Sequence, residues 1–276
     1  MRGVTEECQP DVIDEPVMVE ETLESGQFFN WRKKGDWYET VVEGEKIDVR
    51  DSGEGIEYHG SREVVVELMG LDDSVEDIKR EIDYDDRVEE AIDRYPGLRV
   101  VNAPFFPTVI SFIISAQNRI PRIHDLVLDI AENYGSTIED VAEFPEPRVL
   151  ADVPETELRE MSLGYRAPYV KEASRQIAEE EVNADDIRSM EYIDAHTEIQ
   201  ELMGVGDKVA DCILLFSLDF HEAVPLDTWM QKTIERYYPE LSADGYVETC
   251  ENFREKFGEG AGYAQNYLFH YIRHHG

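Results

Sequence analysis

The strongest constraint on the fold is a stretch of 31 residues, Arg94 to His124, without a single aspartate or glutamate. The chain holds 62 acidic residues among 276, so this gap departs clearly from its average composition. At its centre, the almost wholly apolar run from Val109 to Ile114 predicts a buried helix around which other elements must pack. The stretch also carries Arg119 and Arg122, and arginines without neighbouring carboxylates are suited to binding an anion such as phosphate.

Two further stretches have no acidic residue, Met161 to Lys171 and Gly260 to Gly276. Arg166 lies in the first of them, and Arg99 lies in the long gap described above. We expect these arginines, together with Arg119 and Arg122, to face a polyanion.

The formal net charge of −36 would by itself repel nucleic acid, membranes and acidic substrates. The 26 positive residues, however, are mainly arginine and rarely lysine, which together with many carboxylates indicates a halophilic intracellular protein, as from a halophilic archaeon. At molar salt the Debye length is about 3 Å, so distant charges hardly interact and a polyanionic partner is not excluded. No basic segment followed by an apolar one opens the chain, and we therefore expect a cytoplasmic protein.

Cysteine usage and apolar run length exclude several classes of protein. Cys8, Cys212 and Cys250 lie far apart and form no Cys-x-x-Cys motif, which argues against a disulfide framework and against a cysteine-ligated zinc or iron–sulfur site. The longest apolar runs are far too short to span a bilayer, so no membrane partner is expected.

The chain is predicted to be of the α+β class. Short β-type runs at Trp37 to Val42, Lys46 to Arg50 and Ile56 to His59 predict a small antiparallel sheet. After Asp72 the pattern is helical. We therefore expect an N-terminal antiparallel β domain with a connecting helix over residues 1–95 and an all-helical body over residues 96–276.

The apolar spacing predicts particular helices and connectors. Helices are expected from Ile123 to Tyr134, closed by Gly135, from Val209 to Phe216, and from Tyr263 to Tyr271. Residues 145–154 and 238–245 are expected to be connectors, and the first ten to fifteen residues a frayed acidic tail.

The segment from Leu202 to Cys212 carries the most informative motif. Gly204 and Gly206 predict a tight hairpin whose backbone N–H groups can approach an anion closely. A helix follows at once, and its positive N-terminal dipole adds to that attraction. An ordinary corner between two helices would show the same two glycines, so the hairpin alone does not establish a function.

Lys208 and Asp227 strengthen the functional interpretation. Lys208 falls in the first turn of the new helix, where the dipole disfavours an ammonium and so favours a nucleophilic amine. Asp227 precedes Thr228 and Trp229 and is expected to cap a helix, which would hold its carboxylate rigid. Each residue alone is explained by structure, whereas the pair, about twenty residues apart, favours catalysis.

These motifs resemble those of the helix-hairpin-helix DNA glycosylases, and among them the 8-oxoguanine DNA glycosylases of the eukaryotic type. The resemblance rests on Leu-x-Gly-Val-Gly-x-Lys-Val-Ala-Asp-Cys followed by Ala-Val-Pro-x-Asp, and it covers most of the chain in the family's order. Further matching segments are Thr22 to Arg32, Pro104 to Arg122, Leu163 to Ala167 and Ala261 to Gln265.

The resemblance implies a base-excision-repair glycosylase with associated AP lyase activity that flips out and removes 8-oxoguanine. Lys208 would form a Schiff base with C1′ of the damaged nucleotide, and Asp227 would stabilise the developing sugar cation. The base pocket would consist of Gly26, Cys212, Gln265 and Phe269, with the Gly26 carbonyl detecting the hydrogen on N7 of the lesion.

The resemblance also implies the DNA contacts. Asn118, Tyr165 and Arg166 would meet the orphaned cytosine and fill the gap left by the flipped base. Independently of the resemblance, the acid-free stretch around Arg119 and Arg122 and the hairpin of Gly204 and Gly206 predict that these residues bind phosphates. The expected partner is double-stranded DNA containing oxidised guanine, bound by a monomer associated with the nucleoid. No cofactor is implied, although carbonyls of Leu202 and Val205 could hold a monovalent ion.

Two alternatives remain open at this point. One is a glycosylase of the same fold that removes alkylated bases, although such enzymes generally activate water through the aspartate alone and need no Lys208. The other is a non-catalytic helix-hairpin-helix module that binds DNA, which would need neither the Lys208–Asp227 pair nor a base pocket.

Overall fold

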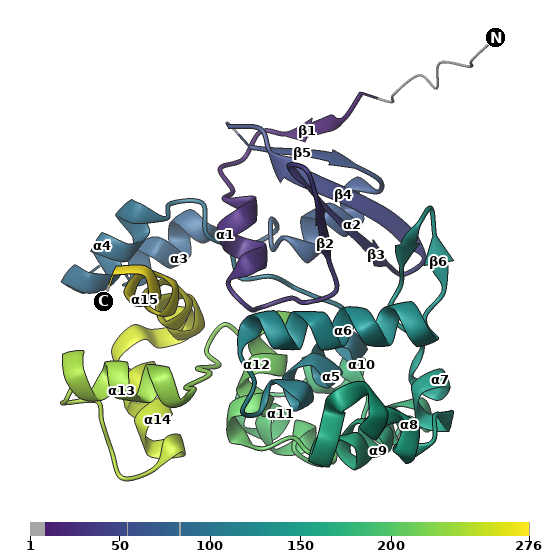
Figure 1. Cartoon of the computed structure of the whole chain (residues 1–276). Coiled ribbons are helices and arrows are strands. Elements are labelled where there is room, and N and C mark those ends of the chain that lie inside the picture. The colour runs from purple at the N-terminus through teal and green to yellow at the C-terminus, as the bar shows by residue number, and fades with distance from the viewer. Residues whose placement is uncertain (1–8, 54, 83, 276) are drawn as a thin grey trace.

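Five antiparallel strands form the N-terminal sheet in the order β1-β5-β4-β3-β2 (Figure 1). The computed structural model describes residues 9–53, 55–82 and 84–275. The strands are β1 (Asp11–Ile13), β2 (Arg32–Lys34), β3 (Trp37–Val42), β4 (Glu45–Asp51) and β5 (Ile56–His59). The antiparallel sheet predicted from the sequence is therefore confirmed, with its three predicted runs at β3, β4 and β5.

The two outer strands, β1 and β2, have three residues each, too few to give an alternating pattern. Residues 11–13 belong to the part predicted to be a frayed tail, and there the prediction is wrong, because β1 pairs with β5. Residues 1–8, including Cys8, lie outside the described residues.

Helices make up almost all of the chain after the sheet, as predicted. Two strands of two residues each, β6 (Thr137–Ile138) and β7 (Val141–Ala142), interrupt them. The α-helices are α1 (Val19–Glu24), α2 (Arg62–Leu68), α3 (Val75–Ile82), α4 (Asp86–Arg94), α5 (Phe105–Ser115), α6 (Ile120–Tyr134), α7 (Pro147–Asp152), α8 (Glu155–Leu158), α9 (Ala167–Ala178), α10 (Ala184–Arg188), α11 (Tyr192–Ile199), α12 (Asp207–Ser217), α13 (Thr228–Tyr237), α14 (Tyr246–Phe257) and α15 (Ala261–His275). The prediction of a connector over residues 145–154 is wrong, because α7 forms there.

The acid-free apolar run forms α5, which is buried along most of its length. It packs against α6, α9 and α12, so the prediction of a buried helix at the centre of the body is confirmed. Val109, Ile110 and Ile114 have no exposed surface, since the helix is covered on several sides.

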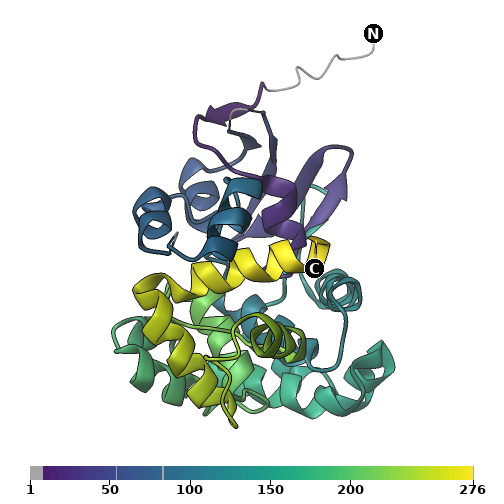
Figure 2. The same ribbon diagram turned by 90° about the vertical axis from the view of Figure 1, so that its left-hand side faces the viewer.

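Helix α15 joins the N-terminal elements to the helical body. Figure 2 shows it running between the two, and it packs against α4 and α14. Its buried side chains donate hydrogen bonds to the chain that precedes α5, from Tyr267 to the carbonyl of Leu98 at 3.1 Å and from Asn266 to that of Arg99 at 3.4 Å. Helix α4 falls within the predicted N-terminal domain, yet it packs against α15, which falls within the predicted helical body. The domain boundary between residues 95 and 96 therefore stays a prediction.

Within residues 9–53, 55–82 and 84–275, no helix combines the length and the apolar character needed to cross a bilayer.

Candidate active site

A cavity of about 490 Å³ lies where the N-terminal segment, α12, the loop before α13 and α15 meet. This volume is within the range of small-molecule sites. The predicted site residues that line it are Gly26, Asn118, Lys208, Cys212, Asp227, Gln265 and Phe269. The structure therefore brings together every residue predicted for catalysis and for the base pocket.

Lys208 is half-buried in the first turn of α12. Its Nζ lies 5.1 Å from the centre of the Phe112 ring, on α5. The ring face attracts a cation and holds the long side chain toward the cavity. Lys208, the nucleophile predicted from the sequence, therefore packs against α5.

The hairpin between α11 and α12 spans residues 200–206. Gly204 has a φ of +93°, and a Cβ atom there would come within 2.8 Å of the Tyr169 Cβ, so both conformation and packing require glycine. Gly206 is the N-cap of α12 and faces open space. Its backbone, at the positive end of the helix, is accessible to an anion.

The two carbonyls predicted to hold a monovalent ion belong to the same hairpin. The carbonyl of Leu202 accepts a hydrogen bond from the N–H of Val205 at 3.1 Å, which closes the turn. A carbonyl oxygen has a second lone pair, so this bond is compatible with an ion, whose presence stays a prediction.

Asp227 caps α13, as the sequence predicts. Its Oδ1 accepts hydrogen bonds from the backbone N–H groups of Trp229 and Met230, at 3.0 and 2.7 Å. These two bonds fix the carboxylate at the wall of the cavity. The sequence-based idea that a cap can also be a rigid catalytic group is consistent with this geometry.

Cys212 is buried in the cavity one helical turn after Lys208. Burial raises the pKa of its thiol to about 11, although the nearby Lys208 side chain acts in the opposite direction. At neutral pH the Cys212 side chain is therefore a thiol and not a thiolate, so it is a poor nucleophile there.

Gln265 and Phe269 lie one turn apart on α15 and face the same cavity. Gln265 is 4 % exposed, and its Oε1 has no hydrogen-bond partner among the described residues. A buried, unbonded carbonyl oxygen is costly unless a ligand supplies a donor. Phe269 makes an edge-to-face contact with Trp229, with ring centroids 5.4 Å apart, and this contact fixes one wall.

Gly26 follows α1 and has a φ of +97°, and a Cβ atom there would come within 2.6 Å of Ile120. Its position is set by the next residue, Gln27, which is buried. The Gln27 amide donates to the carbonyl of Arg99 at 2.9 Å and accepts from the N–H of Val101 at 3.1 Å. Sequence reasoning missed this anchor, because the partners are more than seventy residues away.

The rim of the cavity brings together Asn118, Tyr165 and Arg166. The Arg166 guanidinium hydrogen-bonds the carbonyl of Ala116, in the turn that carries Asn118, and lies 4.4 Å from the centre of the Tyr165 ring. Tyr165 is 48 % exposed, whereas Arg166 is buried beneath it. Two of the acid-free stretches therefore meet at this rim, and Gln265 and Phe269 of the third line the same cavity.

The remaining arginines differ from one another. Arg119 and Arg122 are exposed at the start of α6, where phosphate could reach them. The prediction that Arg99 faces a polyanion is wrong: its side chain is buried, with Nη1 donating to the carbonyl of Gly70 at 3.4 Å and Nη2 3.6 Å from Glu15.

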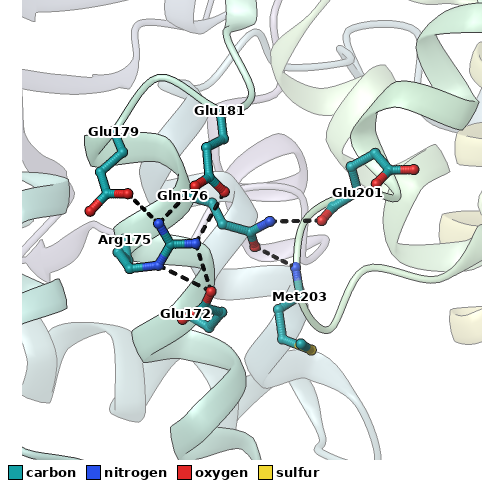
Figure 3. Close-up of polar contacts among 7 residues, drawn as sticks. All are labelled: Glu172, Arg175, Gln176, Glu179, Glu181, Glu201 and Met203. Atoms are coloured by element: carbon teal, nitrogen blue, oxygen red, sulfur yellow. Dashed lines mark hydrogen bonds and ion pairs between the residues drawn. The ribbon is translucent and has the colours of Figure 1, made fainter.

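A glutamine on α9, Gln176, holds the hairpin in place (Figure 3). Its amide donates to the carbonyl of Glu201 at 2.9 Å and accepts from the N–H of Met203 at 2.8 Å. The neighbouring Arg175 makes ion pairs with three glutamates and so is engaged within the protein. No local sequence signal reveals this clamp, because hairpin and helix α9 are separated along the chain.

Comparison with known proteins agrees with this geometry. The family model of the HhH-GPD superfamily of base excision DNA repair proteins matches residues 110–259, more than half of the chain. The chain belongs to this superfamily, and the family resemblance found in its motifs is thereby confirmed.

Two relatives extend the likeness over most of the chain. It is 34 % identical over 239 residues to the probable N-glycosylase/DNA lyase of Methanothermobacter thermautotrophicus, covering 78 % of this chain and 76 % of that protein. The Clostridium acetobutylicum 8-oxoguanine glycosylase/lyase, solved in complex with double-stranded DNA containing cytosine opposite 8-oxoG, is 30 % identical, with a TM-score of 0.87 over 97 % of this chain and 99 % of that one.

The fold is shared more widely. The 3-methyladenine DNA-glycosylase from Archaeoglobus fulgidus has a TM-score of 0.78 at 18 % identity, over 98 % of this chain and 99 % of that one. This likeness concerns the fold alone.

Replacing Gln176 by Ala is expected to weaken binding to damaged and undamaged duplex alike by about tenfold, the order expected for losing one or two hydrogen bonds that order the hairpin. Fluorescence anisotropy with labelled duplexes measures the change. The matched control is Arg175→Gln on the same helix, whose exposed ion pairs contribute about 0–1 kcal/mol. Equal weakening by both variants would contradict a specific role for Gln176.

Proposed function

We propose that this protein is a bifunctional DNA glycosylase and AP lyase that removes 8-oxoguanine from double-stranded DNA after flipping the base out of the helix. The observation that carries the proposal is one cavity lined together by a helix-start lysine, a helix-capping aspartate and a buried glutamine with an unbonded carbonyl oxygen. The names of the two relatives described above support the same activity.

Lys208 is the nucleophile. The electron pair of its neutral amine forms a bond to C1′ of the damaged nucleotide while the bond from C1′ to the base breaks, and the base leaves with the electron pair of that broken bond. Loss of the proton from nitrogen and opening of the sugar ring give a Schiff base. Removal of a proton from C2′ of this intermediate then forms a C2′–C3′ double bond and expels the 3′ phosphate, and this β-elimination is the lyase step.

Asp227 stabilises the positive charge that develops on the sugar as the base departs. Its carboxylate is fixed by two backbone N–H groups before the substrate arrives, so no reorganisation is needed during the reaction. A preorganised anion next to a developing cation is a large source of transition-state stabilisation.

The base is recognised by groups from opposite sides of the cavity. The carbonyl of Gly26 accepts the hydrogen on N7 that distinguishes 8-oxoguanine from guanine, and Gln265 reads another edge of the base. Phe269 stacks on the ring. Cys212 packs as a neutral thiol in the same pocket.

The DNA lies over the rim of the cavity. Asn118, Tyr165 and Arg166 meet the opposite strand and fill the gap left by the flipped nucleotide. Phosphates are bound by Arg119 and Arg122 and by the backbone of Gly204 and Gly206.

Finer features belong to the same proposal. The protein acts as a monomer in the cytoplasm, associated with the nucleoid, and a monovalent ion at the hairpin carbonyls of Leu202 and Val205 supports phosphate binding. Residues 1–95 and 96–276 are its two domains.

Replacing Lys208 by Gln should abolish covalent trapping of the enzyme on 8-oxoguanine duplex by borohydride, because no Schiff base can form. Binding to the duplex should stay largely intact. Gel analysis of trapped complexes measures the first effect and anisotropy the second. Undiminished trapping by the variant would assign the nucleophile to another residue, whereas excision of 8-oxoguanine without any trapping by the wild type would indicate attack by water activated through Asp227 instead of by Lys208.

Replacing Phe269 by Ala should weaken lesion binding by about 1–3 kcal/mol, the usual contribution of stacking one base on an aromatic ring. Gln265→Ala should reduce lesion affinity more than it reduces discrimination against guanine, since the Gly26 carbonyl is the main reader. Competition binding with matched duplexes measures both. Equal excision of guanine and 8-oxoguanine by the wild type would refute this pocket.

Excision should increase from low salt to an optimum at high, roughly molar, potassium chloride. Salt weakens the arginine–phosphate contacts, but it also screens the repulsion between DNA and a protein of charge −36. Single-turnover excision measured across a salt titration, with circular dichroism as a control for folding, tests this. Full activity at about 50 mM salt with a steady decline above it would argue against halophilic adaptation.

A further inference from the structure

A fully buried carboxylate, Asp211, lies on α12 three residues after Lys208. Its Oδ1 accepts a hydrogen bond from the Tyr192 hydroxyl at 2.6 Å, and its Oδ2 accepts one from the Tyr246 hydroxyl at 2.5 Å. Nε2 of His196 lies 3.7 Å from Oδ1. The reaction described above does not use this group, although a buried carboxylate is costly and is retained only where its bonds compensate.

Tyr246 connects this carboxylate to the second catalytic segment. Its hydroxyl oxygen also accepts a hydrogen bond from the N–H of Leu226 at 3.3 Å and lies 3.2 Å from the carbonyl of Val224. Leu226 directly precedes Asp227 in the chain. One oxygen atom, from the first residue of α14, therefore ties the helix of Lys208 to the loop of Asp227.

The location of Tyr246 agrees with this connection. It lines the candidate active site on one side and a second cavity of about 160 Å³ on the other. Asp227 is already fixed on its C-terminal side by capping α13. The Tyr246 hydroxyl contacts the chain on the N-terminal side of Asp227, at Val224 and Leu226.

We infer that Tyr246 is a positioning residue whose hydroxyl, anchored on Asp211, sets the placement of Asp227 relative to Lys208. The inference rests on the proposed function, since it concerns the geometry of that site. A displacement of about 1 Å between reacting groups costs roughly 100-fold in rate. Because the Tyr246 hydroxyl links the two catalytic segments, its loss should affect the rate of the chemical step more than the affinity for DNA.

Tyr246→Phe tests the inference, because it removes the hydroxyl and keeps the ring. The single-turnover rate of 8-oxoguanine excision should fall by about tenfold or more. The rate of borohydride trapping should fall in parallel. The dissociation constant for lesion duplex carrying a non-cleavable sugar should stay within about twofold of the wild-type value, since the contact surface for DNA is unchanged.

The matched control is Tyr192→Phe. It removes the other tyrosine hydroxyl bound to the same carboxylate, but Tyr192 has no hydrogen bond to residues 224–226. Both variants should lower the melting temperature to a similar degree, while Tyr192→Phe keeps the excision rate within about twofold of the wild type. Circular dichroism verifies that each variant is folded.

A second variant covers the case in which Tyr246→Phe does not fold. Asp211→Asn leaves one acceptor oxygen for two tyrosines, so it weakens the anchor without changing its shape. It should slow excision more than Tyr192→Phe does, again with unchanged lesion affinity.

Either of two results overturns the inference. One is a wild-type excision rate for folded Tyr246→Phe, and the other is an equal loss of rate in Tyr246→Phe and Tyr192→Phe, which would make the buried carboxylate a matter of stability alone. Both leave the proposed function in place as long as trapping depends on Lys208. Trapping that persists in Lys208→Gln overturns the proposed function itself.

Discussion

The arrangement of this protein depends on a buried segment, residues 98–101, several of whose backbone groups are bonded by side chains from both halves of the chain. Thr22 and Gln27 bond it from the N-terminal side. Asn266 and Tyr267 of α15 bond it from the other. Since unpaired buried backbone groups each cost about 1–3 kcal/mol, the segment is stable only when both sides are in place. The N-terminal elements and the last helix are therefore held in one relative position.

The candidate active site follows from that constraint. Gly26 is next to one anchor, Gln27, and Gln265 is next to another, Asn266. The two sides of the proposed base pocket are thus placed by residues adjacent to them in the chain, and Lys208 and Asp227 face them from α12 and the entrance of α13. Rigid placement of this kind allows a pocket to tell apart two bases that differ by one hydrogen-bond donor.

The tertiary structure also brings together the stretches of the chain that have no acidic residue. Parts of three stretches without acidic residues, distant in sequence, meet at the rim and wall of one cavity, through Asn118, Arg166 and Phe269. A protein of charge −36 can approach a polyanion where its carboxylates are absent. The same reasoning failed for Arg99, because an arginine in an acid-free stretch can equally serve buried carbonyl groups.

What the sequence determined by itself is local: the β-type runs of β3 and β4, the buried helix α5, the glycine hairpin before Lys208, and the cap at Asp227. Each depends on residues a few positions apart, so its signal survives in a linear pattern. The base-pocket roles of Gly26, Cys212, Gln265 and Phe269 came from resemblance to a family, not from periodicity. Only the tertiary structure decided that Gln27 anchors the Gly26 loop, that Gln176 clamps the hairpin, and that one oxygen of Tyr246 joins the Lys208 helix to the Asp227 loop. These contacts join parts of the chain about 20 to 75 residues apart. The partners of such a hydrogen bond are determined by how whole elements pack, so no local sequence pattern predicts them.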